Sequence, residues 1–169
     1  TNRRIVDIIS DVNLCYSEHA RRYLMECGMP KERTFVVGSP MAEVLRASLE
    51  KIKASDVHAR LGLTRGRYIL LSAHREENID TDCNFIQLFT AVNAMAETYN
   101  MPILYSCHPR SRKRLEATGF PLDRRVIAHE PLGFHDYNCL QMNAFAVVSD
   151  SGTLPEESSF FLSAGSPFP

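Results

Sequence analysis

The second part of the chain alternates between short apolar runs and longer amphipathic stretches. Each apolar run has the length of a buried strand, and each stretch between two runs is long enough for a helix. Strands that alternate with helices are typical of βαβ units, which form a parallel sheet with helices on both faces. The pattern therefore predicts an α/β fold. The expected strands lie near residues 68–73, 103–107, 125–128 and 145–149, and the expected helices at 80–99, 109–118, about 134–143 and 153–163.

The first part of the chain is less regular. The segment "SEHARRYLMECGMP" predicts a helix, because Ser17 suits an N-cap and Gly28 and Pro30 suit a stop. A short strand, "TFVVG", and a second helix, "MAEVLRASLEKIKAS", follow it. We expect residues 1–53 to form a segment of helices packed around this short strand, ahead of the main sheet.

A change in composition suggests where the domains divide. Residues 54–66 are polar and show no clear period, so a boundary is expected there. We assign residues 1–53 to part of a first domain and an interdomain segment. Residues 54–169 are assigned to a Rossmann-like nucleotide-binding domain.

Composition excludes several classes of partner. The net charge is −1, which gives no support for a nucleic-acid or anionic-membrane partner. The five cysteines are odd in number and widely spaced, as is typical of reduced thiols in a cytosolic protein. No apolar run approaches the length of a membrane span, and the N-terminus lacks a signal-peptide core. A cytoplasmic location is therefore expected, with no membrane partner. No cofactor is expected either.

The end of the last expected strand, "SDSGTLPEE", carries candidate chemistry. The strand stops at Asp150 and a helix starts soon after, so the N–H groups of Ser151, Gly152 and Thr153 are expected to be free and to converge. A helix start of this kind can cradle a phosphate. The alternative is simple N-capping by Asp150 or Ser151. One turn into the helix, Glu157 could accept the hydroxyls of a ribose. The adjacent Glu156 is interpreted as offsetting the helix dipole.

Two further strand ends carry a histidine beside an arginine. His74 and Arg75 follow the strand at "SAHREEN", and His108 and Arg110 lie in "SCHPRS". Arginine can bind a diphosphate bidentately, and histidine can donate a hydrogen bond or a proton to it. Charged surface turns and a zinc site are the alternatives. The zinc site would use His74, His108, Cys107 and Asp150, but the usual metal-ligand spacings are absent, so no metal is expected.

Together these motifs resemble those of one known protein family. "SAHREEN", "SCHPRS", "SDSGTLPEES" and the "GSP" after the first short strand resemble the non-hydrolysing UDP-N-acetylglucosamine 2-epimerase family, whose fold is the two-domain GT-B architecture. The segment "SDSGTLPEESSFF" is most similar to the capsule and O-antigen branch of this family. The resemblance runs over the whole chain. It implies that residues 54–169 are one Rossmann-like half of a GT-B fold, incomplete at its C-terminus, and that the chain is a middle piece of a longer enzyme.

The resemblance also implies a reaction. The family inverts C2 of a UDP-HexNAc by eliminating UDP to give a glycal, whose double bond joins C1 and C2, and adding UDP back on the other face. The acids and bases near C2 belong to the upstream half, so the isolated chain is expected to be inactive. A homodimer is expected when the protein is full length.

Residue roles follow from the same resemblance. It implies a catalytic role for His74. It implies substrate binding by Arg3, Arg75, His108, Phe134, Tyr137, Ser151, Gly152, Thr153 and Glu157, with the diphosphate near Ser151 and Gly152, the ribose near Glu157 and the uracil near Tyr137 or Phe134. The chain departs from the family pattern at Ile8, where a histidine is common, and at Glu76, where a second arginine is common.

Two other functions fit the same residues. A GT-B glycosyltransferase uses the same nucleotide half for a different reaction and would need an acceptor site upstream. A non-catalytic fragment that binds or senses a nucleotide sugar would need only the UDP site. The identity of the UDP-HexNAc is not fixed by these residues, because groups that face the sugar come largely from the other half.

Overall fold

A computed structural model of the chain describes residues 2–75, 78, 81–107 and 109–163. It divides into two compact units, Thr1–Val44 (unit 1) and Leu45–Pro169 (unit 2). This division falls inside a helix, Met41–Lys53, whereas the sequence places the boundary of the nucleotide-binding domain after residue 53. The sequence-based domain boundary stays a prediction.

Unit 1 contains a small parallel sheet and short helices. The strand expected at "TFVVG" is confirmed at Thr34–Val36, and it pairs with a second strand that the sequence pattern did not predict. The predicted N-cap is also confirmed, because the Ser17 side chain accepts a hydrogen bond from the Ala20 N–H at 3.2 Å. The elements are α1 (Asn2–Ile9), β1 (Asn13–Cys15), α2 (Glu18–Glu26), the 3-10 helix η1 (Lys31–Arg33), β2 (Thr34–Val36) and the start of α3 (Met41–Lys53).

Unit 2 confirms the predicted alternation of strands and helices. All four predicted strands are present within a residue or two of their expected bounds, and every pairing between them is parallel. The short helix α4 lies in the stretch that showed no clear period. The elements after α3 are α4 (Val57–Leu61), β3 (Ile69–Ser72), α6 (Asp82–Tyr99), β4 (Ile103–Ser106), α7 (Pro109–Thr118), β5 (Val126–His129), α8 (Phe134–Met142), β6 (Ala146–Ser149) and α9 (Leu154–Ser163).

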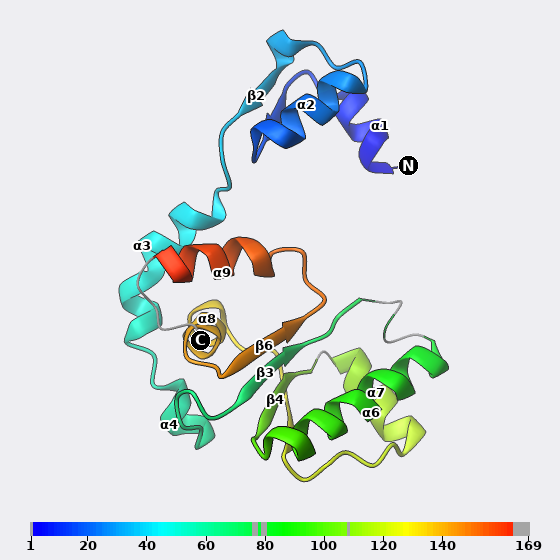
Figure 1. The fold of residues 1–169 in the computed structure, drawn as a ribbon, viewed down its shortest axis with the longest axis vertical. Helices are drawn as coiled ribbons and strands as arrows, with labels where there is room; N and C mark the ends of the chain where they lie inside the picture. The colour runs from blue at the N-terminus through cyan, green and yellow to red at the C-terminus, as the bar shows by residue number, and fades with distance from the viewer. Residues whose placement is uncertain (1, 76–77, 79–80, 108, 164–169) are drawn as a thin grey trace. The chain divides into compact units, whose positions relative to one another are not determined.

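Helices cover both faces of this sheet. Figure 1 shows α6 and α7 on one side of the strands and α8 and α9 on the other. On the first side, alternate residues of β3 and β4 pack against α6, around the buried rings of Phe85, Phe89 and Tyr105. On the second side, the Tyr68 hydroxyl donates to the Leu140 carbonyl of α8 at 2.6 Å. The predicted parallel sheet with helices on both faces is therefore confirmed.

No helix among the described residues is both long and apolar enough to span a bilayer.

Candidate functional site

The order of the strands marks one place on the sheet edge. The order is β5-β4-β3-β6, so the chain moves outward from β3 through β4 to β5 and then returns to add β6 on the other side of β3. The order thus reverses between β3 and β6. In open α/β sheets ligands bind beyond the carboxyl ends of the strands at such a reversal. The segments that begin with His74 and Ser149 lie at this point.

A cavity of about 250 Å³ opens at this reversal. Five of the predicted site residues line it: His74 after β3, Tyr137 on α8, Ser151 and Thr153 after β6, and Glu157 on α9. The wall therefore combines an imidazole, a phenol, two hydroxyls and a carboxylate. This set can donate hydrogen bonds to an anion and accept bonds from hydroxyl groups.

The other predicted site residues that the structure describes do not line this cavity. Among the described residues that line the cavity, neither Arg75, Phe134 nor Gly152 is present. The Arg75 Nε donates to the Asp150 carbonyl at 2.8 Å, and the Phe134 ring is exposed and contacts the His135 ring. His108 lies outside the described residues. Arg3 lines a separate cavity of about 310 Å³ within unit 1.

Of the three serines at the strand ends, Ser72 and Ser106 were not predicted as site residues. Ser72, Ser106 and Ser149 are the last residues of β3, β4 and β6, and all three line the cavity. Ser72 and Ser149 are register partners in neighbouring strands. Pro131, Leu132 and Leu154 add an apolar wall. A polar residue that ends an otherwise apolar strand run was the signal in the sequence for these serines.

The turn after β6 differs from its prediction in one respect. Two of the three N–H groups expected to be free are already bonded within the turn. The Ser151 N–H donates to Ser149 Oγ at 3.0 Å, and the Thr153 N–H donates to Ser151 Oγ at 3.3 Å. The hydroxyls of Ser151 and Thr153 lie 3.0 Å apart. The side-chain hydroxyls hold the turn in shape, so an anion here would bind mainly to hydroxyl groups.

Gly152 lies at the tip of this turn, and the chain itself does not require a glycine there. A Cβ built on Gly152 meets nothing within 4 Å, and its φ lies outside the left-handed region. The fold would therefore accept alanine at this position. Any need for glycine would have to come from a ligand that approaches the backbone closely.

The Tyr137 phenol stays neutral in the cavity. Burial raises its pKa, the carboxylate of Glu157 raises it further, and a hydrogen bond with Ser72 offsets part of the rise. A neutral phenol can both donate and accept a hydrogen bond. Tyr137 can therefore contact either a carbonyl or an N–H group of a base.

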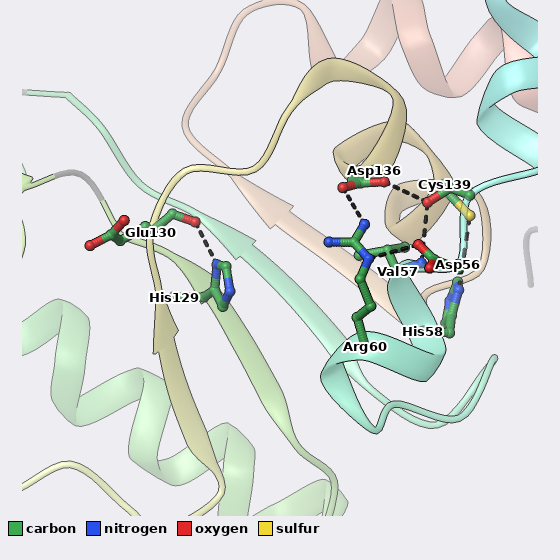
Figure 2. A network of polar contacts seen from close by, with 9 residues as sticks. Asp56, Val57, His58, Arg60, His129, Glu130, Asp136 and Cys139 are labelled. Carbon is green, nitrogen blue, oxygen red and sulfur yellow. Dashed lines mark hydrogen bonds and ion pairs between the residues drawn. The ribbon is translucent and has the colours of Figure 1, made fainter.

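A polar network fixes the helix that carries Tyr137. Figure 2 shows Arg60 of α4 extending to Asp136 in the first turn of α8. The Arg60 Nη2 lies 2.5 Å from Asp136 Oδ2, and the Ser55 hydroxyl donates to Asp136 Oδ1 at 2.6 Å. Both hydrogen bonds hold the pKa of Asp136 below its usual range, and the bond from Ser55 has the larger effect. Because Tyr137 follows Asp136 directly in the chain, the network fixes the backbone position of Tyr137.

The zinc alternative is not tested as a whole, because His108, one of its four ligands, lies outside the described residues. Over residues 2–75, 78, 81–107 and 109–163, no group of three or more histidine, cysteine, aspartate or glutamate side chains is placed to hold a metal ion. Cys107 is buried, and burial raises the pKa of its thiol. A raised pKa disfavours the thiolate that zinc requires.

Comparison with known proteins gives a consistent result. The solved structure of a UDP-N-acetylglucosamine 2-epimerase from Rickettsia bellii is 42% identical over 94% of this chain, with a TM-score of 0.79. The Methanocaldococcus jannaschii UDP-GlcNAc 2-epimerase, solved in complex with UDP-GlcNAc and UDP, is 27% identical over 95% of this chain, with a TM-score of 0.85. The curated UDP-N-acetylglucosamine 2-epimerase of Methanococcus maripaludis is 28% identical over 167 residues.

The chain spans less than half the length of these relatives. It covers 42% of the R. bellii protein, 46% of the M. jannaschii protein and 45% of the M. maripaludis protein. The sequence profile of the family described as UDP-N-acetylglucosamine 2-epimerase matches residues 1–164, nearly the whole chain. The chain belongs to the UDP-N-acetylglucosamine 2-epimerase family.

Proposed function

We propose that this chain carries the UDP-binding part of an enzyme that inverts C2 of a UDP-HexNAc by elimination and re-addition of UDP. The observation that carries the proposal is the cavity at the strand-order reversal, which five residues with suitable chemistry line. The M. jannaschii relative, solved with UDP-GlcNAc and UDP, supports the choice of ligand.

Each lining residue has a role in this proposal. The hydroxyls of Ser151 and Thr153 and the His74 imidazole bind the diphosphate, where negative charge develops as UDP leaves C1. Donors fixed in advance around such charge stabilise the transition state. Glu157 accepts the ribose hydroxyls, and Tyr137 packs near the uracil beside Pro131 and Leu132.

The remaining predicted residues have less direct roles. Arg75, Phe134 and Gly152 lie outside the cavity lining and would reach a ligand only at its edge. We keep Arg3 and His108 as proposed substrate contacts of the whole protein. His74 is the proposed catalytic residue in this chain, through proton or hydrogen-bond donation to the leaving diphosphate.

The proton transfer at C2 needs carboxylates that we do not assign to this chain. Asp150 and Glu157 both belong to the nucleotide side of the sheet edge, so neither is placed to reach C2 in this proposal. Loss of such an acid or base typically costs a factor of roughly 10² to 10⁴ in rate. We therefore expect the 169-residue chain to bind UDP but not to epimerise UDP-GlcNAc at a useful rate.

Calorimetry with UDP tests the binding site. Ser151→Ala should weaken binding by about 0.5–1.5 kcal/mol, and Glu157→Ala by about 1.5–3 kcal/mol, because the second removes a charged acceptor. Gly152→Ala is the matched steric test, since the fold accepts it and only a ligand close to the backbone would be displaced. Unchanged affinity in both Ser151→Ala and Glu157→Ala would remove the proposed site.

An NMR experiment tests the reaction. The chain is incubated with UDP-GlcNAc in deuterated water, and deuterium at C2 and released UDP are followed. Exchange at the rate of an intact family member would place the catalytic groups within this chain and contradict the proposed division of roles.

We also propose that the whole protein is a cytoplasmic homodimer. Sedimentation of the full-length product tests the dimer.

A further inference from the structure

The loop after β3 is held by the carboxylate of Asp150, which follows β6. The backbone N–H of His74 donates to both carboxylate oxygens, each at 3.0 Å, and the N–H of Arg75 donates to Oδ2 at 2.9 Å. Two consecutive N–H groups therefore share one acceptor that lies 76 residues further along the chain. The first of these two residues is the histidine that lines the cavity.

The same aspartate also holds the far side of that turn. The Asn78 side-chain amide donates to Asp150 Oδ2 at 3.0 Å, and the Asn78 N–H donates to the Arg75 carbonyl at 3.0 Å. The Arg75 Nε in turn donates to the Asp150 carbonyl at 2.8 Å. His74, Arg75 and Asn78 thus all donate to the Asp150 carboxylate, and the Arg75 side chain adds a bond to the Asp150 carbonyl.

The protonation state of Asp150 fits an acceptor and not an acid. Partial burial acts to raise its pKa, but hydrogen bonds from the N–H groups of Arg75 and His74 and from Asn78 outweigh it, so the pKa lies below its usual range. The group stays ionised near neutral pH, and its oxygens are occupied by N–H donors. It is also absent from the described residues that line the cavity.

We infer that Asp150 is a positioning residue of the UDP site: its carboxylate fixes the backbone of residues 74–75 and so sets the direction from which the His74 imidazole enters the cavity. The inference rests on the proposed function, because it concerns the same cavity. It differs from N-capping of α9, the role considered from sequence, because among the described residues the Asp150 carboxylate accepts hydrogen bonds from His74, Arg75 and Asn78, which follow β3.

The test uses Asp150→Asn and Asp150→Ala in the 169-residue chain. Asp123→Asn is the matched control, because the Asp123 carboxylate also accepts a backbone N–H, from Arg125 at 2.8 Å, but precedes β5 at the opposite edge of the sheet. NMR measures amide hydrogen exchange at His74 and Arg75 and the imidazole resonances of His74. Calorimetry measures UDP affinity.

We expect exchange at both amides to be at least about tenfold faster in Asp150→Ala than in the wild-type chain and unchanged in the control. The His74 ring resonances should shift only in the Asp150 variants. UDP affinity should fall roughly tenfold, with Asp150→Asn intermediate because its amide keeps one acceptor oxygen. Unchanged exchange, or faster exchange with unchanged UDP affinity, would overturn the inference.

The two measurements separate a failure of this inference from a failure of the proposed function. A wild-type chain that does not bind UDP would contradict the proposed function, whereas amide exchange, which needs no ligand, would still show whether Asp150 holds the turn. If both Asp150 variants lose cooperative unfolding, Asn78→Ala replaces them. It removes one donor to the same carboxylate, and unchanged exchange at His74 in that variant would also overturn the inference.

Discussion

The two units of the chain are built from similar elements but differ in how much they bury. In unit 2, four parallel strands lie between two layers of helices, and the rings of Tyr68, Phe85, Phe89 and Tyr105 are fully buried. Over residues 2–44, Cys15 and Thr34 are the buried side chains. Large apolar side chains such as Ile9 (74% exposed) and Leu14 (62% exposed) lie at the surface of unit 1 instead.

The difference shows what strand number does for stability. A two-stranded sheet has few interior positions, and three or more strands with a covered face are needed for independent stability. β1 and β2 form three pairs of residues, whereas β3 is flanked by a strand on each side and covered on both faces. We therefore expect unit 2 to hold nearly all the folding free energy of the chain.

Hydrogen exchange should show the largest contrast. Amides in β3 and β4 should exchange about a thousandfold more slowly than those in β1 and β2, which corresponds to about 4 kcal/mol of opening free energy. The reason is that exchange in β3 requires the central sheet to open. NMR or mass spectrometry on the whole chain measures both regions at once. Similar protection in the two sheets would contradict the contrast.

Replacing one phenylalanine in each unit sharpens the comparison. Phe89 is fully buried, with ring centroids 4.7 Å from Phe85 and 5.4 Å from Tyr105, so Phe89→Ala should cost about 3–5 kcal/mol. Phe35 is 48% exposed on β2, and Phe35→Ala should cost less than about 1 kcal/mol. Urea denaturation gives both values. Equal losses would mean that buried side chains in unit 1 contribute as much to the free energy of unfolding as those in unit 2.

The same contrast explains which parts of the fold could be predicted from the sequence. Strands covered on both faces must be apolar throughout, so β3 and β4 appear as continuous runs and were found with nearly correct bounds. β1 was missed because its three residues, Asn13–Cys15, do not form an apolar run: the first is polar, and only the last is buried. α4 was missed for a similar reason, since Val57 is its one buried residue among those described.

The candidate site was predictable where chemistry and local position coincide. His74 and Ser151 each lie two residues after a strand end, and Glu157 lies in the first turn of α9. The structure brings all three to one cavity. The contact of Asp150 with the loop after β3 joins residues 76 positions apart. A single sequence carries no signal for such a pairing. The strand order, which places β6 beside β3, is what creates it.

A serine in each unit provides a smaller test. The Ser55 hydroxyl donates to Asp136 and accepts the Val57 N–H at 3.2 Å at the start of α4, so Ser55→Ala should cost about 1–2 kcal/mol. The exposed Ser10 hydroxyl donates to the Val6 carbonyl in unit 1, and Ser10→Ala should cost less than about 0.5 kcal/mol. Thermal denaturation compares the two variants. A cost at Ser10 equal to that at Ser55 would contradict the expectation that unit 2 holds nearly all the folding free energy.

The smallest expected effect is a pH dependence that arises from Asp136 in unit 2. Hydrogen bonds from Ser55 and Arg60 lower the pKa of this carboxyl in the folded state. A group with a depressed folded-state pKa stabilises the fold above its unfolded pKa, about 3.9 for aspartate, and this contribution is lost as the pH falls through the folded-state value. The free energy of unfolding should therefore differ more between the wild-type chain and Asp136→Asn at pH 7 than below about pH 3.

Partial exposure limits the size of this effect. The Asp136 side chain is 26% exposed, so solvent screens its charge, and the pH-dependent part should be about 0.5–1 kcal/mol. Urea denaturation of both proteins across this pH range measures it. The sign is fixed, because the wild-type advantage must shrink as the pH falls. An advantage that stays constant, or grows, would mean that Asp136 does not hold α4 and α8 together through its charge, and that the fixed position of Tyr137 has another cause.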